Sequence, residues 1–355
     1  MSAPVEIGSG HEGSIRDQIS AYFSRLKNGE MGALPAVLAL LSLAILFASL
    51  SPFFLTTMNF ANLLVQAAQL TVLACALVFV LLLAEIDLSA GVTAGTGMAL
   101  FVLLNQMMGV NWILAILAAL VFGALVGWVI GFFVAKVGVP SFVVTLGLFL
   151  GFQGLMLVML GDGGLFRLDI PELKAIMNGN MPIWGGWLML AIMIIVSISL
   201  GFYDRAQRKR VGVVNRPIGL MWARIGFIGL ISAIGIAVLS VNRSTSVVPI
   251  EGVPIVIPFV VAIIFIGTFV LDRTRFGRHL YAVGGNPEAA RRAGIKVAKI
   301  RITAFIICSS LAIVSGILAA SRIGAIESTA GRSIVLSGVA AAVVGGVSLF
   351  GGRGR

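Results

Sequence analysis

Charged residues are scarce in this sequence. Only 11% of the 355 residues are Asp, Glu, Lys or Arg, and 59% are hydrophobic, whereas a soluble domain carries about 25% charged residues. The shortage of charge excludes an ordinary soluble domain and is typical of a membrane protein that crosses the bilayer many times.

Cysteine and histidine are also rare. Cys75 and Cys308 lie within apolar runs, and His11 and His279 lie in polar segments without a partner at ligand spacing. This pattern indicates neither a disulfide framework nor a metal site. We expect no bound metal and interpret both histidines as surface residues.

Motifs for catalysis are missing as well. No G-x-x-x-x-G-K-[ST] stretch occurs, so the chain has no loop of the kind that cradles ATP phosphates. No set of nucleophile, base and acid stands out either. We therefore expect no catalytic residues, no cofactor and no enzyme activity. The isoelectric point of 10.6 does not indicate nucleic acid, because the basic residues cluster in loops between apolar runs.

Long apolar runs dominate what is present. A crossing needs about 20 apolar residues, and only helices satisfy their backbone in lipid with this pattern. The predicted fold class is an all-α polytopic transmembrane bundle of about 10 spans. We place them near 34–54, 60–84, 88–107, 112–135, 140–160, 184–202, 225–241, 253–271, 302–321 and 334–351.

The first 33 residues are polar and differ from the transmembrane domain, residues 34–355. They lack the apolar core of a signal peptide. Apolar residues recur at helical spacing between Ile15 and Leu26, which predicts a short amphipathic helix on the membrane surface. With the N-terminus inside, 20 of the 25 Lys and Arg residues fall in cytoplasmic segments. This bias predicts a cytoplasmic N-terminal tail.

The polar stretch between the eighth and ninth apolar runs contains a full set of helix end signals. Asn286 is a good N-cap, and Pro287 suits the first helical position. Glu288 in the first turn and Arg291 and Arg292 in the last turn carry the signs of charge that the helix dipole favours at each end. Gly294 supplies a left-handed stop. Alone, this pattern fits a solvated basic turn as well as a docking helix.

Four stretches resemble bacterial sugar ABC-importer permeases of the ribose, galactose and xylose type, and most of all the xylose type. They are FGRHLYAVGGNPEAARRAGI (Phe276–Ile295), AEIDLSAGVTAG (Ala84–Gly95), VPSFVVTLG (Val139–Gly147) and the segment Ser321–Gly354. The resemblance covers the chain from about Leu55 onward. It implies that the stretch around Asn286 is the family's cytoplasmic coupling loop and favours docking over a solvated turn.

The resemblance implies a permease subunit that moves a monosaccharide, D-xylose or a related pentose, across the bacterial inner membrane. The expected partners are an ABC ATPase that binds the ATP, a periplasmic sugar-binding protein, a second permease copy and membrane lipid. The coupling loop is placed at 272–301, and an extra helix pair at 184–245 fits the xylose type. Relatives continue with about two more apolar segments, so the chain is expected to end early. The expected ATPase-coupling residues are Gly285, Asn286, Pro287, Glu288, Ala289, Ala290, Arg291, Gly294 and Ile295.

Polar residues within the apolar runs are candidates for a substrate path. Asn62, Gln66 and Gln69 share one face of the second run, and Gln153 lies in the fifth. Amides can bond a sugar hydroxyl either as donors or as acceptors. Hydrogen bonds between helices are an equally good explanation.

Glu85 and Asp87 lie at the break between the second and third runs and are also path candidates, because charges at such depth are often functional. We prefer the alternative that Asp87 or Ser89 caps the next helix and that Glu85 reaches the interface.

Glycines recur at every fourth position in two of the runs. Gly123, Gly127 and Gly131 lie in the fourth run, and Gly91 and Gly95 in the third. Small residues at this spacing favour close helix packing over a role in the substrate path.

A secondary transporter driven by ions or protons is the alternative function. Such proteins usually have intramembrane acids and broken helices in two halves, and both features are sparse in this sequence. The few acids and the coupling-loop resemblance favour the ABC importer.

Overall fold

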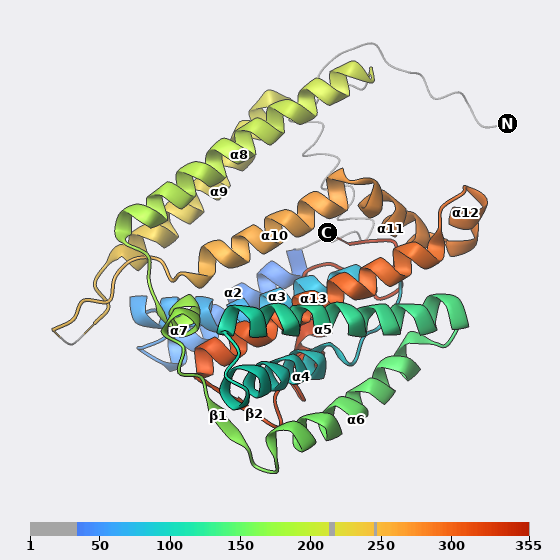
Figure 1. Cartoon of the computed structure of the whole chain (residues 1–355). Helices are drawn as coiled ribbons and strands as arrows, with labels where there is room; N and C mark the ends of the chain where they lie inside the picture. Colours follow the sequence, from blue (N-terminus) through green and yellow to red (C-terminus); the bar gives the residue numbers. More distant parts are fainter. Residues whose placement is uncertain (1–33, 213–216, 245–246, 355) are drawn as a thin grey trace. The chain divides into compact units, whose positions relative to one another are not determined.

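The computed structural model describes residues 34–212, 217–244 and 247–354 (Figure 1). The amphipathic helix predicted within residues 1–33 lies outside the described residues. The chain forms two compact units, which are treated separately below. Unit 1 comprises residues 1–58 and 180–253, and unit 2 comprises residues 59–179 and 254–355.

Unit 1 contains the predicted extra helix pair. In its described part the helices are α2 (Leu34–Leu50), α8 (Ile183–Arg210) and α9 (Ile218–Ser240), and α8 packs against α9. Their outward side chains are mostly large and apolar, as expected of helices that face lipid. The C-terminal turn of α8 carries three basic residues, which suits the negative end of a helix dipole.

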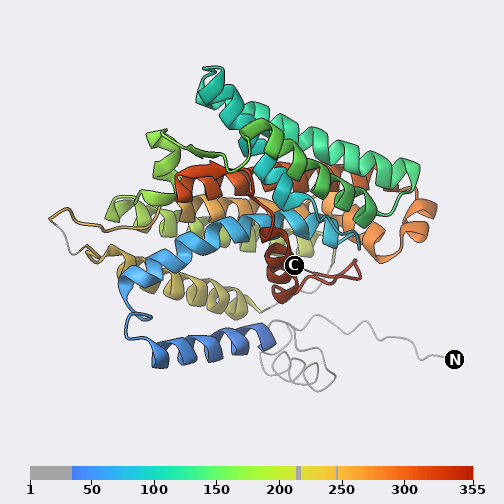
Figure 2. The same cartoon turned by 90° about the horizontal axis from the view of Figure 1, so that it is seen from below.

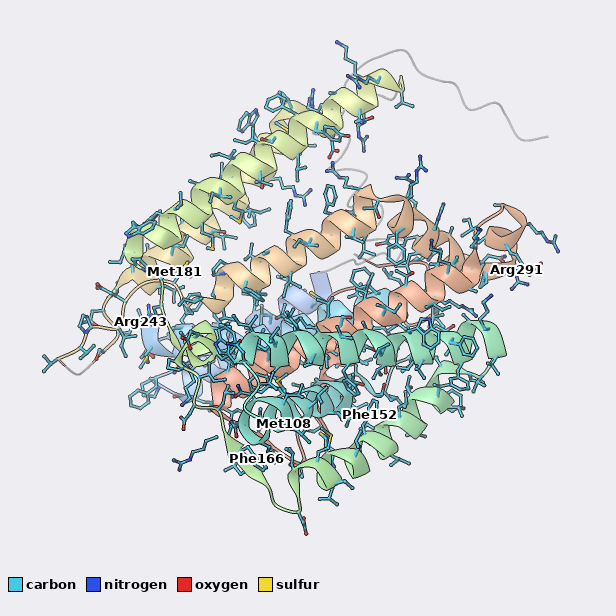
Figure 3. The ribbon with its side chains drawn as sticks, in the orientation of Figure 1. Met108, Phe152, Phe166, Met181, Arg243 and Arg291 are labelled. Atoms are coloured by element: carbon cyan, nitrogen blue, oxygen red, sulfur yellow. The ribbon has the colours of Figure 1, made fainter. Side chains whose placement is uncertain are left out.

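Arg243 lies in unit 1, in the loop that follows α9. Its guanidinium is buried and donates to Asn180 Oδ1 at 3.1 Å, to the carbonyl of Gly252 at 3.0 Å and to the carbonyl of Leu239 (Figure 3). Burial lowers the pKa of Arg243, because loss of solvent disfavours the charged form. The three acceptors explain how the charge is tolerated there.

Unit 2 holds most of the helices. Its long helices are α3 (Thr57–Leu81), α4 (Ala90–Val102) with a π-helical end η1 (Leu103–Met107), α5 (Trp112–Phe132) with a π-helical end η2 (Phe133–Val137), α6 (Ser141–Leu160), α10 (Val256–Arg273) and α13 (Val297–Ile323). Its shorter elements are β1 (Leu165–Arg167), α7 (Pro171–Asn178), α11 (Arg275–Gly285), α12 (Pro287–Arg292), β2 (Ala325–Glu327) and α14 (Ile334–Val344).

Helix α13 lies at the centre of unit 2, where it packs against α4, α5 and α7. The glycines of α5 allow its backbone to approach α13. A Cβ atom at Gly127 would lie 2.6 Å from the Cα of Ile306, and one at Gly131 would lie 2.6 Å from the Cα of Ile302. Both distances are too short for a real contact. The packing role predicted for this glycine series is confirmed.

The glycines of α4 also serve packing, but against a turn. A Cβ atom at Gly91 would collide with the carbonyl oxygen of Gly331, and one at Gly95 would lie 2.8 Å from the sulfur of Met156. Gly331 adopts φ +83°, a conformation that glycine permits without strain. The turn before α14 can therefore lie directly on α4.

The two ends of α13 lead to different structures. Helix α12 precedes it, and strand β2 follows it and pairs antiparallel with β1, with Leu165 opposite Glu327. Within unit 2, α12 and α7 consequently lie at opposite edges (Figures 1 and 2). The sequence did not predict the small strand pair or α7.

All ten predicted apolar segments form helices, and the predicted all-α membrane bundle is confirmed. Eight helices of the described chain are long and apolar enough to cross a membrane, and Ala36–Leu50 and Ile334–Val344 are shorter. Helix α14 ends well before the predicted limit of the 334–351 segment. Gly346 at φ +100° turns the chain there, because a glycine readily adopts such a backbone angle.

Candidate functional site

The helix predicted in the polar loop is present as α12. Asn286 precedes it in extended conformation, and its side-chain oxygen accepts a hydrogen bond from the backbone N–H of Ala289 at 2.9 Å. Pro287 occupies the first helical position, where its missing N–H has no cost. The start of the helix is thus fixed by the residues that predicted it.

The end of α12 forms a Schellman motif. Gly294 has φ +84° and donates its N–H to the carbonyl of Arg291 at 2.9 Å. The N–H of Ile295 donates to the carbonyl of Ala290 at 3.0 Å. These two bonds satisfy carbonyls that the short helix leaves without internal partners. The predicted stop at Gly294 is confirmed.

Helix α12 has an anchored face and a charged face. Ala290 is 4% exposed and belongs to the main hydrophobic cluster, against which Ile295 packs. Glu288 lies 3.6 Å from both Arg291 and Arg292 in exposed ion pairs, and Arg291 extends outward from the helix (Figure 3). Exposed pairs of this kind stabilise a helix by only about 0.3–0.5 kcal/mol each. Their charges therefore remain accessible to a partner.

Helix α11 directly precedes α12 and was missed in the sequence. Thr274 caps it by accepting a hydrogen bond from the N–H of Gly277 at 3.2 Å. Phe276, Leu280 and Val283 recur at helical spacing and pack in the main hydrophobic cluster. That spacing was the available signal. The two glycines that end the helix, including Gly285, hid it.

Asp87 holds the turn just before α4 through hydrogen bonds with Ser89, the residue that precedes the helix. The residue is fully buried, and its Oδ1 accepts from the backbone N–H of Ser89 at 2.9 Å and from its hydroxyl at 2.6 Å. Its Oδ2 accepts from the Cys308 thiol at 3.7 Å. Asp87 thus fixes the turn that leads into α4, whereas the Ser89 side chain forms no cap hydrogen bond with the helix itself.

Glu85 forms an ion pair with a residue of α13, and its expected place at the membrane interface stays a prediction. Its side chain is 13% exposed, and its Oε1 lies 3.4 Å from Nε of Arg301 on α13. The reason is a backbone reversal just before it, where Ala84 adopts φ +59°. This reversal directs the acid toward the loop that carries α12. The partner is 216 residues away in the sequence, so no local pattern could have named it.

The amide candidates remain separate from these acids. On α3, Asn62 and Gln66 are exposed and Gln69 is half-buried, while Gln153 is half-buried on α6. Within the described residues, none of these four side chains forms a hydrogen bond. Their role in a substrate path stays a prediction.

No donor set for a metal is assembled in the described part of the chain, where no group of three His, Cys, Asp or Glu residues lies together. Both cysteines are free. The candidate features are therefore α12, the acids Glu85 and Asp87, and the four amides of α3 and α6.

Comparison with known proteins identifies relatives along nearly the whole chain. The xylose transport system permease protein XylH of Escherichia coli K12 is 31% identical over 336 residues, which cover 94% of this chain and 83% of XylH. The ribose import permease protein RbsC of the same strain is 30% identical, with coverages of 90% and 79%. The autoinducer 2 import system permease protein LsrC of Enterobacter sp. 638 is 29% identical, with coverages of 93% and 74%.

No solved structure matches the chain. A family model described as branched-chain amino acid transport system / permease component matches residues 59–352. This match contains the break before α4, helix α12 and the segment after α14. The chain therefore belongs to the permease family that this model describes and, by its similarity to XylH and RbsC over most of its length, to the sugar ABC-importer permeases of the xylose and ribose type.

Proposed function

We propose that this chain is the membrane-spanning permease subunit of a sugar ABC importer of the xylose and ribose type, with D-xylose or a related pentose as substrate. The observation that carries the proposal is α12, a capped helix with an exposed charged face at one edge of unit 2. The relatives named as xylose and ribose permeases support the substrate class.

In this proposal α12 docks in a groove of a cytoplasmic ABC ATPase. A helix of six residues is too short to persist alone in water, so its caps and its packing through Ala290 hold it ready for a partner. The ATPase binds and hydrolyses ATP, because the chain has no phosphate-binding loop of its own. The permease itself has no catalytic residues.

The orientation places α12 in the cytoplasm and the N-terminus on the same side. The excess of Lys and Arg in the segments of that side supports it. Lys136 at the end of η2 belongs to these segments, whereas Arg167 and Arg322 lie by the strand pair at the other end of α13. A periplasmic sugar-binding protein delivers the substrate to that second end.

A second copy of the chain completes the path in the bacterial inner membrane, and lipid covers the remaining apolar surface. ATPase closure moves α12, and the two permeases tilt to open alternately to each side. The amides of α3 and Gln153 then offer donors and acceptors to sugar hydroxyls.

The docking role is tested with Glu288→Lys, which opposes the helix dipole and reverses the charge that a groove would contact. Gly294→Val is the second variant, because a β-branched residue is strained at φ +84°. Both should insert in the membrane and lose co-purification of the ATPase.

The matched control is Glu172→Lys. Glu172 is exposed, follows a proline and lies in the first turn of α7, so the same charge reversal occurs at an equivalent helix position at the opposite edge. It should retain the ATPase. Full assembly and transport by both α12 variants would show that the loop is only a solvated turn.

A further inference from the structure

Three distant segments meet at the base of α12: the break between α3 and α4 (residues 82–89), the end of α11, and residues 351–354. The N–H of Gly352 donates to the carbonyl of Leu82 at 2.8 Å. Gly284 lies so close to this carbonyl that a Cβ atom would collide with it. Tyr281 of α11 donates its hydroxyl to the carbonyl of Gly354 at 2.9 Å. These segments contact one another mainly through backbone atoms. No flexible side chain therefore lies between the break and the end of α11, which leads directly into α12.

The break is also held to α13 at two points. Glu85 pairs with Arg301, in the second turn of α13, and Asp87 accepts from Cys308, two turns further along. Helix α13 begins only two residues after Ile295, the last residue of the α12 exit motif. Because Arg301 lies in the second turn of this rigid helix, a displacement of α12 would also displace Arg301.

From the break the connection continues into α4. The N–H groups of Ile86 and Leu88 donate to the hydroxyls of Ser141 and Thr145 on α6, each at 3.2 Å. Helix α4 then begins at Ala90 and is buried along almost its whole length. A shift of the break must therefore move α4 within the bundle or break these bonds.

The Glu85–Arg301 ion pair leaves a hydrogen-bond donor of Arg301 unused. The Nε atom of Arg301 is buried and lies 3.4 Å from the carboxylate, yet it forms no hydrogen bond with any described residue. The two side chains are 25% and 13% exposed, so water screens the pair only in part. A displacement of a few tenths of an ångström would align this donor with the carboxylate or separate the two charges.

We propose that Glu85 and Arg301 are positioning residues that transmit the movement of α12 to the break and hence to α4. The proposal rests on the proposed function, since it assumes that an ATPase moves α12. It assigns Glu85 to energy coupling and removes it from the substrate path.

The test uses the complete complex of permease, ATPase and binding protein in lipid, with Glu85→Gln and Arg301→Gln. Both variants should keep the ATPase bound, because α12 is unchanged. The stimulation of ATP hydrolysis by sugar-loaded binding protein, and the sugar transported per ATP, should fall about five- to thirtyfold. The control is Lys299→Gln, which removes an exposed cation from the first turn of the same helix and should behave as wild type.

The charge-reversed double variant Glu85→Arg with Arg301→Glu distinguishes a pair that transmits the movement of α12 from a pair that only stabilises the fold. It restores an ion pair and should recover a large part of the lost coupling. Wild-type coupling in both single variants would overturn the proposal. Loss of folding in all three variants would overturn it too, because the pair would then only hold the fold. If the wild-type complex itself shows no ATP-driven uptake, the proposed function fails instead.

Discussion

The contact between α5 and α13 makes a quantitative prediction at Gly127. In Gly127→Ala the new Cβ atom would lie 2.6 Å from the Cα of Ile306, whereas ordinary contacts begin at 3.4 Å. The Cβ atom would also collide with the carbonyl oxygen of Phe305, so the helices would have to separate locally by at least about 0.8 Å, and overpacking of this kind costs about 1–3 kcal/mol. The clash is with backbone, so no side-chain rotation can relieve it.

Gly151→Ala on α6 is the matched control. No atom lies within 4 Å of the position that its Cβ would take, and alanine favours a helix over glycine by up to about 1 kcal/mol. Both variants gain this helix propensity, so their free energies of unfolding, measured by denaturant titration in mixed micelles, should differ by the overpacking cost alone, about 1–3 kcal/mol. Equal stability would refute the close approach of α5 to α13.

Two further predictions concern orientation and the buried acid. Topology reporters fused after Arg210 and after Arg292 should both score as cytoplasmic and one after Lys174 as periplasmic; a periplasmic score after Arg292 would reverse the proposed orientation. Asp87→Ala should lower the free energy of unfolding by about 2–4 kcal/mol, because the two donors of Ser89 would stay buried without an acceptor. Asp87→Asn keeps an acceptor oxygen and should cost less, and thermal unfolding that ranks the two variants the other way would contradict this account.

Local signals in the sequence predicted α12 well. Asn286, Pro287 and Gly294 act through their own backbone and near neighbours. Their pattern in the sequence was therefore enough to predict where α12 begins and ends. The glycine series of α5 was readable for the same reason, because a repeat at i+4 marks one helix face. Apolar run length was enough to locate the spans, although it overestimated α14.

Long-range contacts could not be predicted in this way. Glu85 pairs with Arg301 just after Ala84 adopts a left-handed backbone conformation. Alanine rarely adopts this conformation, so the sequence did not predict it. The pairing of β1 with β2 joins two strands of three residues from the two separate sequence segments of unit 2, and such short strands leave no periodicity. Helix α11 was hidden because its terminal glycines are typical of loops.

The substrate path remains a prediction for a different reason. Asn62, Gln66 and Gln69 share a face of α3 in the structure as they do in the sequence, yet a sugar or a second copy is needed to give that face a role. Glu85 and Asp87, which the sequence grouped with them, point instead to α13 and α4.

The most direct test of the central proposal is the energy source for uptake. Permease, ATPase and sugar-binding protein would be reconstituted in liposomes, and entry of radiolabelled D-xylose measured with either ATP or an imposed proton or sodium gradient. The account predicts uptake that requires ATP and the ATPase subunit and disappears with Glu288→Lys. Uptake by the permease alone, driven by an ion gradient without ATP, would contradict it.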